Sequence, residues 1–209
     1  MRIKPDSLKQ LTFIIGSLTF MIALSLFVSR TSANYRNYSG YMKLWQDVGL
    51  FLEFDPSAAN RTNTVCVGGE WHIFPSHFFL PANAKLEYVE DGFKGILPQH
   101  YSSENGTFTE PLQPFNDRNE EEQSRYVKLT QCDFYVGSTL PETAIAKAAE
   151  ELKVEVKLEP VFSERFVSAA IEGWAIGKAY YIPIDPTEFK VLVWKDYSFF
   201  QVNATKIEG

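Results

Sequence analysis

The chain has 209 residues, of which 45% are hydrophobic and 15% aromatic, and its formal net charge at pH 7 is −6. A chain of this length can bury a core as one domain, and its aromatic content excludes an intrinsically disordered protein. The acidic balance argues against nucleic acid as a partner, because binding to phosphates needs a basic surface.

The first predicted element is a transmembrane helix at residues 10–29, preceded by a short N-terminal segment, 1–9, that we expect in the cytosol. Residues 10–29 contain no charged side chain. A helix rises about 1.5 Å per residue, so this run is as long as the hydrocarbon core of a bilayer is thick, about 30 Å. The alternative is a signal peptide cleaved near Thr31-Ser32-Ala33. The length of the apolar run favours a retained helix.

Glycosylation sequons place residues 30–209 on the luminal or extracellular side of that membrane. Four Asn-x-Ser/Thr patterns follow the apolar run, where chance predicts about one. The proximity of the first to the membrane makes it a doubtful acceptor. The four positions are Asn37, Asn60, Asn105 and Asn203.

The two cysteines, Cys66 and Cys132, agree with an oxidising compartment. Each is flanked by strand-like sequence, and a single pair in a luminal domain predicts one disulfide. Two free buried thiols are the alternative, because unpaired cysteine is also a common core residue.

The segments after the apolar run predict a small α/β domain with a mixed sheet and short helices. Ser39 can cap a helix that ends at Leu52 and buries Leu44, Trp45 and Val48, and Pro141 can open a helix that ends at Leu152. Residues 98–124 contain three prolines and an acidic run, and they predict a long acidic loop. Strands are predicted at 64–68, 85–89, 133–137, 153–161, 178–182 and 189–202, the last two as a hairpin.

The segment at 64–81, TVCVGGEWHIFPSHFFLP, invites three chemical interpretations. A phosphate-binding turn is excluded, because the G-x-G-x-x-G spacing is missing and Glu70 would repel a phosphate. A zinc site is not indicated, since His72 and His77 do not have the i, i+4 spacing of helical ligands. We therefore predict no metal and no cofactor. The acidic run Glu120-Glu121-Glu122 similarly predicts a solvated loop rather than a metal site.

A carbohydrate platform is the third interpretation of the same segment. The ring of Trp71 can pack against the apolar face of a sugar, and Glu70 can accept hydrogen bonds from its hydroxyls. The alternative is a plain core cluster under the sheet, which is the more common use of such aromatic runs. Its members would be Trp71, Phe74, Phe78, Phe79 and Leu80.

Three segments together, VCVGGEWHIFPSHFFLP, GFKGILPQ and FNDRNEEEQSRYVKLTQCDFYV, carry a resemblance to a known family. They resemble the C-terminal region of glycosyltransferase family 22, the dolichyl-phosphate-mannose-dependent mannosyltransferases, and most of all its α-1,2-mannosyltransferases of lipid-linked N-glycan assembly. The resemblance covers residues from about 34 to 202, and the run 10–29 matches the last membrane helix of the family. The matching residues are Cys66, Gly68, Glu70, Trp71, Phe74, Pro75, Ser76, Phe78, Leu80, Pro81, Phe93, Gly95, Leu97, Pro98, Asn116, Asp117, Asn119, Glu121, Glu122, Ser124, Arg125, Tyr126 and Cys132.

The resemblance implies the C-terminal luminal part of an endoplasmic-reticulum membrane mannosyltransferase, which transfers mannose from dolichyl-phosphate-mannose to a lipid-linked oligosaccharide in protein N-glycosylation. The acidic catalytic residues of the family lie in a luminal loop near its N-terminus that has no match here. No catalytic residue is therefore assigned, and we expect this chain alone to transfer no mannose. The chain would then be a fragment of a larger enzyme or a separate piece that acts with a partner.

The binding residues expected within the matched motifs are Glu70, Trp71, Arg125 and Tyr126. Glu70 would accept acceptor hydroxyls beside Trp71, and Arg125 would pair with an acid of the 116–122 loop. The alternative function is a single-pass or secreted glycoprotein that binds carbohydrate or protein without catalysis.

Overall fold

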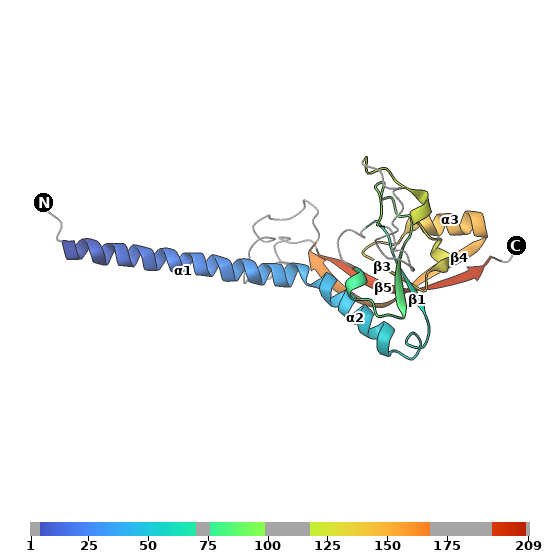
Figure 1. Cartoon of the computed structure of the whole chain (residues 1–209), viewed down its shortest axis with the longest axis horizontal. Helices are drawn as coiled ribbons and strands as arrows, with labels where there is room; N and C mark the ends of the chain where they lie inside the picture. Colours follow the sequence, from blue (N-terminus) through green and yellow to red (C-terminus); the bar gives the residue numbers. More distant parts are fainter. Residues whose placement is uncertain (1–4, 70–75, 99–117, 168–193, 208–209) are drawn as a thin grey trace, which may run out of the picture. The chain divides into compact units, whose positions relative to one another are not determined.

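The computed structural model describes residues 5–69, 76–98, 118–167 and 194–207, which Figure 1 draws in colour. The chain divides into two compact units. One consists of Met1–Gly40 with Phe166–Lys195, and the other of Tyr41–Arg165 with Asp196–Gly209.

The first unit is built on one unbroken helix, α1 (Pro5–Tyr38). Its large apolar side chains between Leu8 and Val28 are exposed. Hydroxyl side chains within this run donate to carbonyl oxygens four residues earlier, as at Thr12, Thr19 and Ser25. Among the described residues, α1 is the one helix that is long and apolar enough to cross a membrane.

Helix α1 continues past the predicted segment 10–29 as far as Tyr38. Residues 30–38 contain neither glycine nor proline, so nothing in them interrupts the helix. One non-helical residue, Ser39, separates α1 from α2 (Gly40–Phe54), at the position where a cap was predicted.

The second unit is organised around a five-stranded sheet in the order β2-β1-β3-β5-β4. Strand β1 is parallel to both β2 and β3, whereas β3 is antiparallel to β5. The prediction of a mixed sheet is thus confirmed. Because β1, β2 and β3 are parallel, their carboxyl ends lie at one edge of the sheet and their amino ends at the other. The strands are β1 (Asn63–Val67), β2 (Ala84–Tyr88), β3 (Phe134–Gly137), β4 (Val154–Val167) and β5 (Trp194–Lys206).

Part of the predicted hairpin, including its first strand at 178–182, lies outside the described residues. The final strand is present as β5, which pairs with β3 and neighbours β4. Sequence patterns located this strand, but they did not identify the partners that it takes in the sheet.

Helix α2 covers one face of the sheet. The Phe51 ring lies 5.7 Å from that of Phe134 and 5.5 Å from that of Phe199, so α2 contacts β3 and β5 directly. The predicted buried face of this helix is confirmed, because the side chains that define it are fully buried. They are Leu44, Trp45, Val48 and Leu52.

Helix α3 (Glu142–Leu152) covers the opposite face, and Figure 1 shows α2 and α3 on opposite sides of the strands. Its residues Ala144 and Ala148 are buried in one cluster with Tyr135 of β3. The same cluster contains Cys66 and Cys132, which form the predicted disulfide with their Cα atoms 5.9 Å apart. Successive residues of β3 and β5 therefore face opposite sides of the sheet, because side chains alternate between the two faces along a strand.

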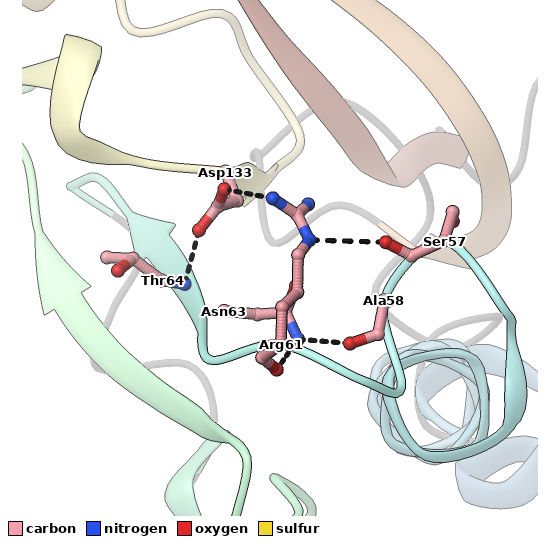
Figure 2. A network of polar contacts seen from close by, with 6 residues as sticks. All are labelled: Ser57, Ala58, Arg61, Asn63, Thr64 and Asp133. Carbon is pink, nitrogen blue, oxygen red and sulfur yellow. Dashed lines mark hydrogen bonds and ion pairs between the residues drawn. The ribbon is translucent and has the colours of Figure 1, made fainter.

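A polar network lies at the amino ends of the parallel strands (Figure 2). The Asp133 carboxylate accepts hydrogen bonds from the Arg61 guanidinium and from the backbone N–H of Thr64, both at 2.8 Å. Arg61 also donates through Nε to the Ser57 carbonyl, 3.2 Å away. The fully buried Asn63 donates to the Ala58 carbonyl at 2.9 Å. The network joins the loop after α2 to β1 and to the residue that precedes β3.

Candidate functional site

The segments that carry the family resemblance meet at the carboxyl edge of β1, β2 and β3. Strand β1 leads into Gly68-Gly69, β2 leads into 89–98, and the segment 118–127 returns alongside β2. The backbone N–H of Val127 donates to the Tyr88 carbonyl at 2.8 Å, and Tyr88 and Tyr126 form a parallel bridge. Ligands of open α/β sheets bind outside the carboxyl ends of strands, so this edge is the candidate site.

Gly68 allows a close approach between β1 and the segment that follows β2. A Cβ atom at this position would lie 2.6 Å from Asp91 Oδ2 and 2.8 Å from the Tyr135 hydroxyl. The next backbone N–H, that of Gly69, donates to the same Asp91 carboxylate at 3.4 Å. Only glycine leaves room for this arrangement, which explains its place at the start of the motif.

Glu70 and Trp71 follow Gly69 in the chain but lie outside the described residues. The prediction that they bind acceptor hydroxyls therefore stays a prediction, like the role of Phe74. Of the same aromatic segment, Phe78 ends η2 (Ser76–Phe78) and is 83% exposed. The interpretation of this residue as part of a core cluster is wrong, because its ring is exposed and contacts that of Phe79 edge-on at 5.2 Å.

Arg125 and Glu122 form the ion pair that the sequence predicted. Arg125 ends the short helix η4 (Gln123–Arg125), and its Nε lies 3.4 Å from Glu122 Oε2. The Arg125 side chain is only 8% exposed, and its Nη1 is buried without a hydrogen-bond partner among the described residues. Such a buried guanidinium depends strongly on its one carboxylate partner.

Tyr126 connects the other two matched segments. Its hydroxyl lies 3.1 Å from the Phe93 carbonyl and 3.1 Å from Glu121 Oε1, and its single hydrogen can serve either acceptor. Burial raises the pKa of Tyr126, and the hydrogen bond to Glu121 and the charges of Glu121 and Glu90 raise it further. The phenol is therefore held in its neutral, hydrogen-bonding form.

The run Glu120-Glu121-Glu122 is not the uniformly solvated loop that was predicted. Glu120 is exposed and pairs with Arg118, whereas the Glu121 side chain is only 17% exposed. Glu121 binds the Tyr126 hydroxyl and pairs with Lys94 at 3.5 Å. The three carboxylates thus have different partners, which the local sequence did not reveal.

The described part of this loop also contacts the second matched segment. The Asn119 side-chain oxygen accepts a hydrogen bond from the Ile96 N–H at 3.0 Å, and a Cβ on Gly95 would lie 2.8 Å from the Asn119 amide. Asn119 itself has a φ of 55°, a left-handed conformation that asparagine tolerates better than most residues. The motif residues Gly95 and Asn119 thus fix the loop against the carboxyl edge.

An ion pair between Glu90 and Lys147 completes the edge, and sequence analysis missed it. Glu90 follows β2, while Lys147 lies on α3. The Glu90 carboxylate raises the pKa of Lys147, so the ammonium stays charged. Neither residue falls within a matched motif, and their separation along the chain hides the pair from local patterns. Lys147 is the one basic residue of α3, and this is the local signal that points to it.

The described side chains of this edge provide hydrogen-bond donors and acceptors and paired charges. Glu90, Glu121 and Glu122 each contact a cation or a hydroxyl, whereas Asp91 accepts a hydrogen bond from the backbone N–H of Gly69. Within the described residues, no group of three or more His, Cys, Asp or Glu side chains is placed to hold a metal ion.

The predicted glycosylation sites have different environments. Asn60 is exposed in the turn after α2, and Asn203 is partly exposed on β5, whereas Asn105 lies outside the described residues. Asn37 is only 2% exposed, so its amide is not accessible to a glycosylating enzyme in the folded chain. The structure thus gives a second reason to doubt Asn37 as an acceptor, besides its closeness to the predicted membrane helix.

Comparison with curated proteins confirms the resemblance that the motifs indicated. The chain is 36% identical over 127 residues to the alpha-1,2-mannosyltransferase Alg9 of Drosophila melanogaster, which covers 58% of the chain and 20% of that relative. It is 38% identical over 107 residues to alg9 of Schizosaccharomyces pombe, covering 48% of the chain and 18% of that relative. It is 28% identical over 197 residues to algn-9 of Caenorhabditis elegans, covering 84% and 31%.

The chain thus spans about a fifth to a third of the length of these relatives. No family model matches it, and no solved structure matches it.

Proposed function

We propose that this chain forms the luminal C-terminal part of an α-1,2-mannosyltransferase of the endoplasmic-reticulum membrane. In that enzyme, mannose would move from dolichyl-phosphate-mannose to a lipid-linked oligosaccharide during protein N-glycosylation. The observation that carries the proposal is the identity of up to 38% with curated α-1,2-mannosyltransferases. The gathering of the three motif segments at one sheet edge supports it, because a scattered set of motifs would have no common task.

The properties of α1 support a membrane location. Its apolar side chains face outward all along the run, and hydroxyls such as that of Thr19 are satisfied within the helix. Lipid tolerates a helix only when its polar groups have such internal partners. We propose that α1 spans the bilayer and that the second unit lies in the lumen, where its disulfide is stable.

The role that we propose for the second unit is to hold the glycan acceptor rather than to break or form the glycosidic bond. The described carboxylates of the carboxyl edge are engaged: Glu90, Glu121 and Glu122 with Arg125, Tyr126, Lys94 and Lys147, and Asp91 with the Gly69 N–H. A catalytic base must instead reach a substrate hydroxyl directly. The base of the reaction would therefore come from another part of the complete enzyme.

A chimaera tests the proposed function. The part of Schizosaccharomyces pombe alg9 that aligns with this chain is replaced by the matching part of this chain, in cells that lack their own enzyme. We expect membranes from these cells to transfer labelled mannose from dolichyl-phosphate-mannose to the lipid-linked acceptor. The matched control carries the same segment with Cys66→Ala and Cys132→Ala and should lose the transfer.

A chimaera that forms its disulfide, stays in the membrane and transfers no mannose would contradict the proposal. The purified chain alone, placed in lipid with donor and acceptor, should transfer no mannose. Turnover above a control without protein would overturn the assignment of the chemistry to another part of the enzyme.

The luminal orientation has its own test. Expressed in cells with a glycosylation machinery, the chain should carry a glycan at Asn60, which is exposed, and none at Asn37, which lies in the last turn of α1 close to the proposed membrane span. Asn60→Gln should then remove one glycan in a gel-mobility assay, whereas Asn37→Gln should change nothing. A chain that resists carbonate extraction but carries no glycan at any sequon would contradict a luminal second unit.

A further inference from the structure

A pocket of about 190 Å³ lies beside the motif residues, between the segment that follows β2, the 123–129 segment and α3. Tyr126 forms part of its wall, so the pocket adjoins the carboxyl edge. The remaining polar lining comes from Glu90, Gln123, Lys128, Lys147 and Glu151. These residues come from three separate parts of the chain, and the fold alone brings them around one space.

The charges in the pocket cancel. Lys147 pairs with Glu90, and Lys128 Nζ lies 3.6 Å from Glu151 Oε2. Glu121, the other carboxylate beside Tyr126, pairs with Lys94 outside the pocket. Neither a free anion nor a free cation would gain a net attraction here, because each approaching charge meets both signs at similar distance. The pocket therefore suits a neutral ligand.

The polar groups nevertheless retain hydrogen-bonding capacity. An ammonium has three hydrogens to donate and a carboxylate has about four acceptor positions, so one ion pair uses only part of either group. The Gln123 amide adds both a donor and an acceptor. A ligand with several hydroxyl groups on its edge can use such mixed donors and acceptors at once.

The floor of the pocket is apolar. Its apolar lining combines the partly exposed Val127 and Leu152 with the largely buried Leu129, Ala144 and Ala148. A sugar ring has this same combination of a polar edge and an apolar face. Pockets for drug-sized ligands have about 300–1,000 Å³, so the smaller volume here fits a single ring rather than several.

We propose that this pocket binds one neutral hexopyranose ring, a mannose unit of the glycan acceptor. The ring would lie on the α3 floor, with its hydroxyls toward the Lys147–Glu90 and Lys128–Glu151 pairs. This inference rests on the proposed function for the identity of the sugar. It adds a separate binding surface, centred on α3, to the motif residues of the carboxyl edge.

Direct binding tests the proposal. The full chain, held in detergent micelles or lipid nanodiscs, is titrated with methyl α-mannopyranoside, and saturation-transfer NMR reports contact between the sugar and the protein. We expect saturable binding. Inorganic phosphate serves as the charged probe, and we expect it neither to bind in the pocket nor to displace the sugar.

Two ion pairs of the chain provide matched variants. Lys128→Ala with Glu151→Ala removes a pair that borders the pocket, and Lys157→Ala with Glu155→Ala removes an equally long, exposed pair on β4. Both pairs have N–O distances of 3.6 Å, and all four side chains are more than half exposed, so neither change should unfold the chain. We expect the first variant to bind the sugar about tenfold more weakly and the second to bind it unchanged.

Gln123→Ala gives a second check, because the residue lines the pocket but is exposed. It should also weaken binding while leaving the melting temperature unchanged. Absence of saturable binding to the folded chain would overturn the proposal, as would equal weakening in both ion-pair variants or displacement of the sugar by phosphate.

The failures of the two proposals are distinguishable. If the chimaera transfers mannose but the chain binds no methyl α-mannopyranoside, only the pocket assignment fails. If the pocket binds the sugar but the folded chimaera is inactive, the sugar site stands and the proposed enzyme function fails.

Discussion

The polar side chains at the two ends of the parallel strands differ in the kind of partner that they bind. At the amino ends, Asp133 binds the Arg61 guanidinium and the Thr64 N–H, and Asn63 binds backbone carbonyls of the preceding loop, so most of these contacts are to backbone groups (Figure 2). At the carboxyl ends, side chains bind side chains: the Tyr126 hydroxyl contacts Glu121 in the same segment, Lys147 pairs with Glu90 from a distant one, and Tyr126 and Lys147 border a pocket. Backbone partners fix a fold, whereas side-chain partners around a space can exchange with a ligand. We therefore expect the amino end to serve stability and the carboxyl edge to bind the ligand that we propose.

The largest expected effect comes from removing the disulfide, which supports both ends at once. The bond between Cys66 and Cys132 closes a sequence separation of 66 residues. The chain-entropy estimate for such a loop is about 4 kcal/mol, so Cys66→Ala with Cys132→Ala should lower the free energy of unfolding by roughly that amount. Denaturant titration measures it. A loss below about 1 kcal/mol would show that the disulfide does not organise this unit.

Arg125→Ala should have the next largest effect, and it tests whether the carboxyl edge also contains purely structural parts. The substitution removes a side chain that is 8% exposed and leaves Glu122 without its cation. We expect a loss of about 2 kcal/mol in unfolding free energy. The folded fraction should bind methyl α-mannopyranoside as the unchanged chain does. Weaker sugar binding at full stability would instead place Arg125 in the binding site.

Asp133→Asn tests the amino end. The substitution removes the ion pair with Arg61 and weakens the hydrogen bond from the Thr64 N–H. We expect the free energy of unfolding to fall by about 1–2 kcal/mol. Sugar binding and mannose transfer by the chimaera should be unchanged.

Arg61→Ala serves as the partner in a double-mutant cycle. Because the Arg61 side chain is 46% exposed, the coupling energy should be below about 1 kcal/mol. If Asp133→Asn abolished mannose transfer by the chimaera without lowering stability, the amino end would not be purely structural.

The smallest expected effect is a dependence of stability on alkaline pH. The pKa of Tyr126 is raised from its ordinary value of 10 chiefly by burial, and burial likewise raises the pKa of Tyr88 to about 12. The folded chain then holds these protons after the unfolded chain has released them. Their contribution to stability is complete below pH 10 and is lost as the pH rises through the folded-state pKa values.

Tyr126→Phe should reduce that alkaline slope and lower stability at neutral pH by about 1 kcal/mol through the lost hydrogen bond. Unfolding measured between about pH 9 and 11 provides the comparison. An identical slope in the variant would show that the Tyr126 hydroxyl is not held by Glu121 and the Phe93 carbonyl.

Sequence by itself determined the elements whose signals are local. The uncharged run 10–29 predicted the core of α1, and apolar patterns predicted β1, β2, β3 and the buried face of α2. The order and spacing of the motifs predicted the similarity to α-1,2-mannosyltransferases. These signals are local because helix periodicity, strand alternation and motif spacing all depend on residues close together in the chain.

Only the tertiary structure decided which of those residues are covered and which meet. It exposes Phe78, buries Asn37 and turns Glu121 inward to Tyr126, against or beyond what the local sequence indicated. It also pairs Glu90 with Lys147 across 57 residues and encloses the pocket beside them. The environment of each of these side chains is set by the packing of segments that are far apart in the chain. Local propensity contains no record of that packing, since it depends on the register of the sheet and on the placement of α3 against it.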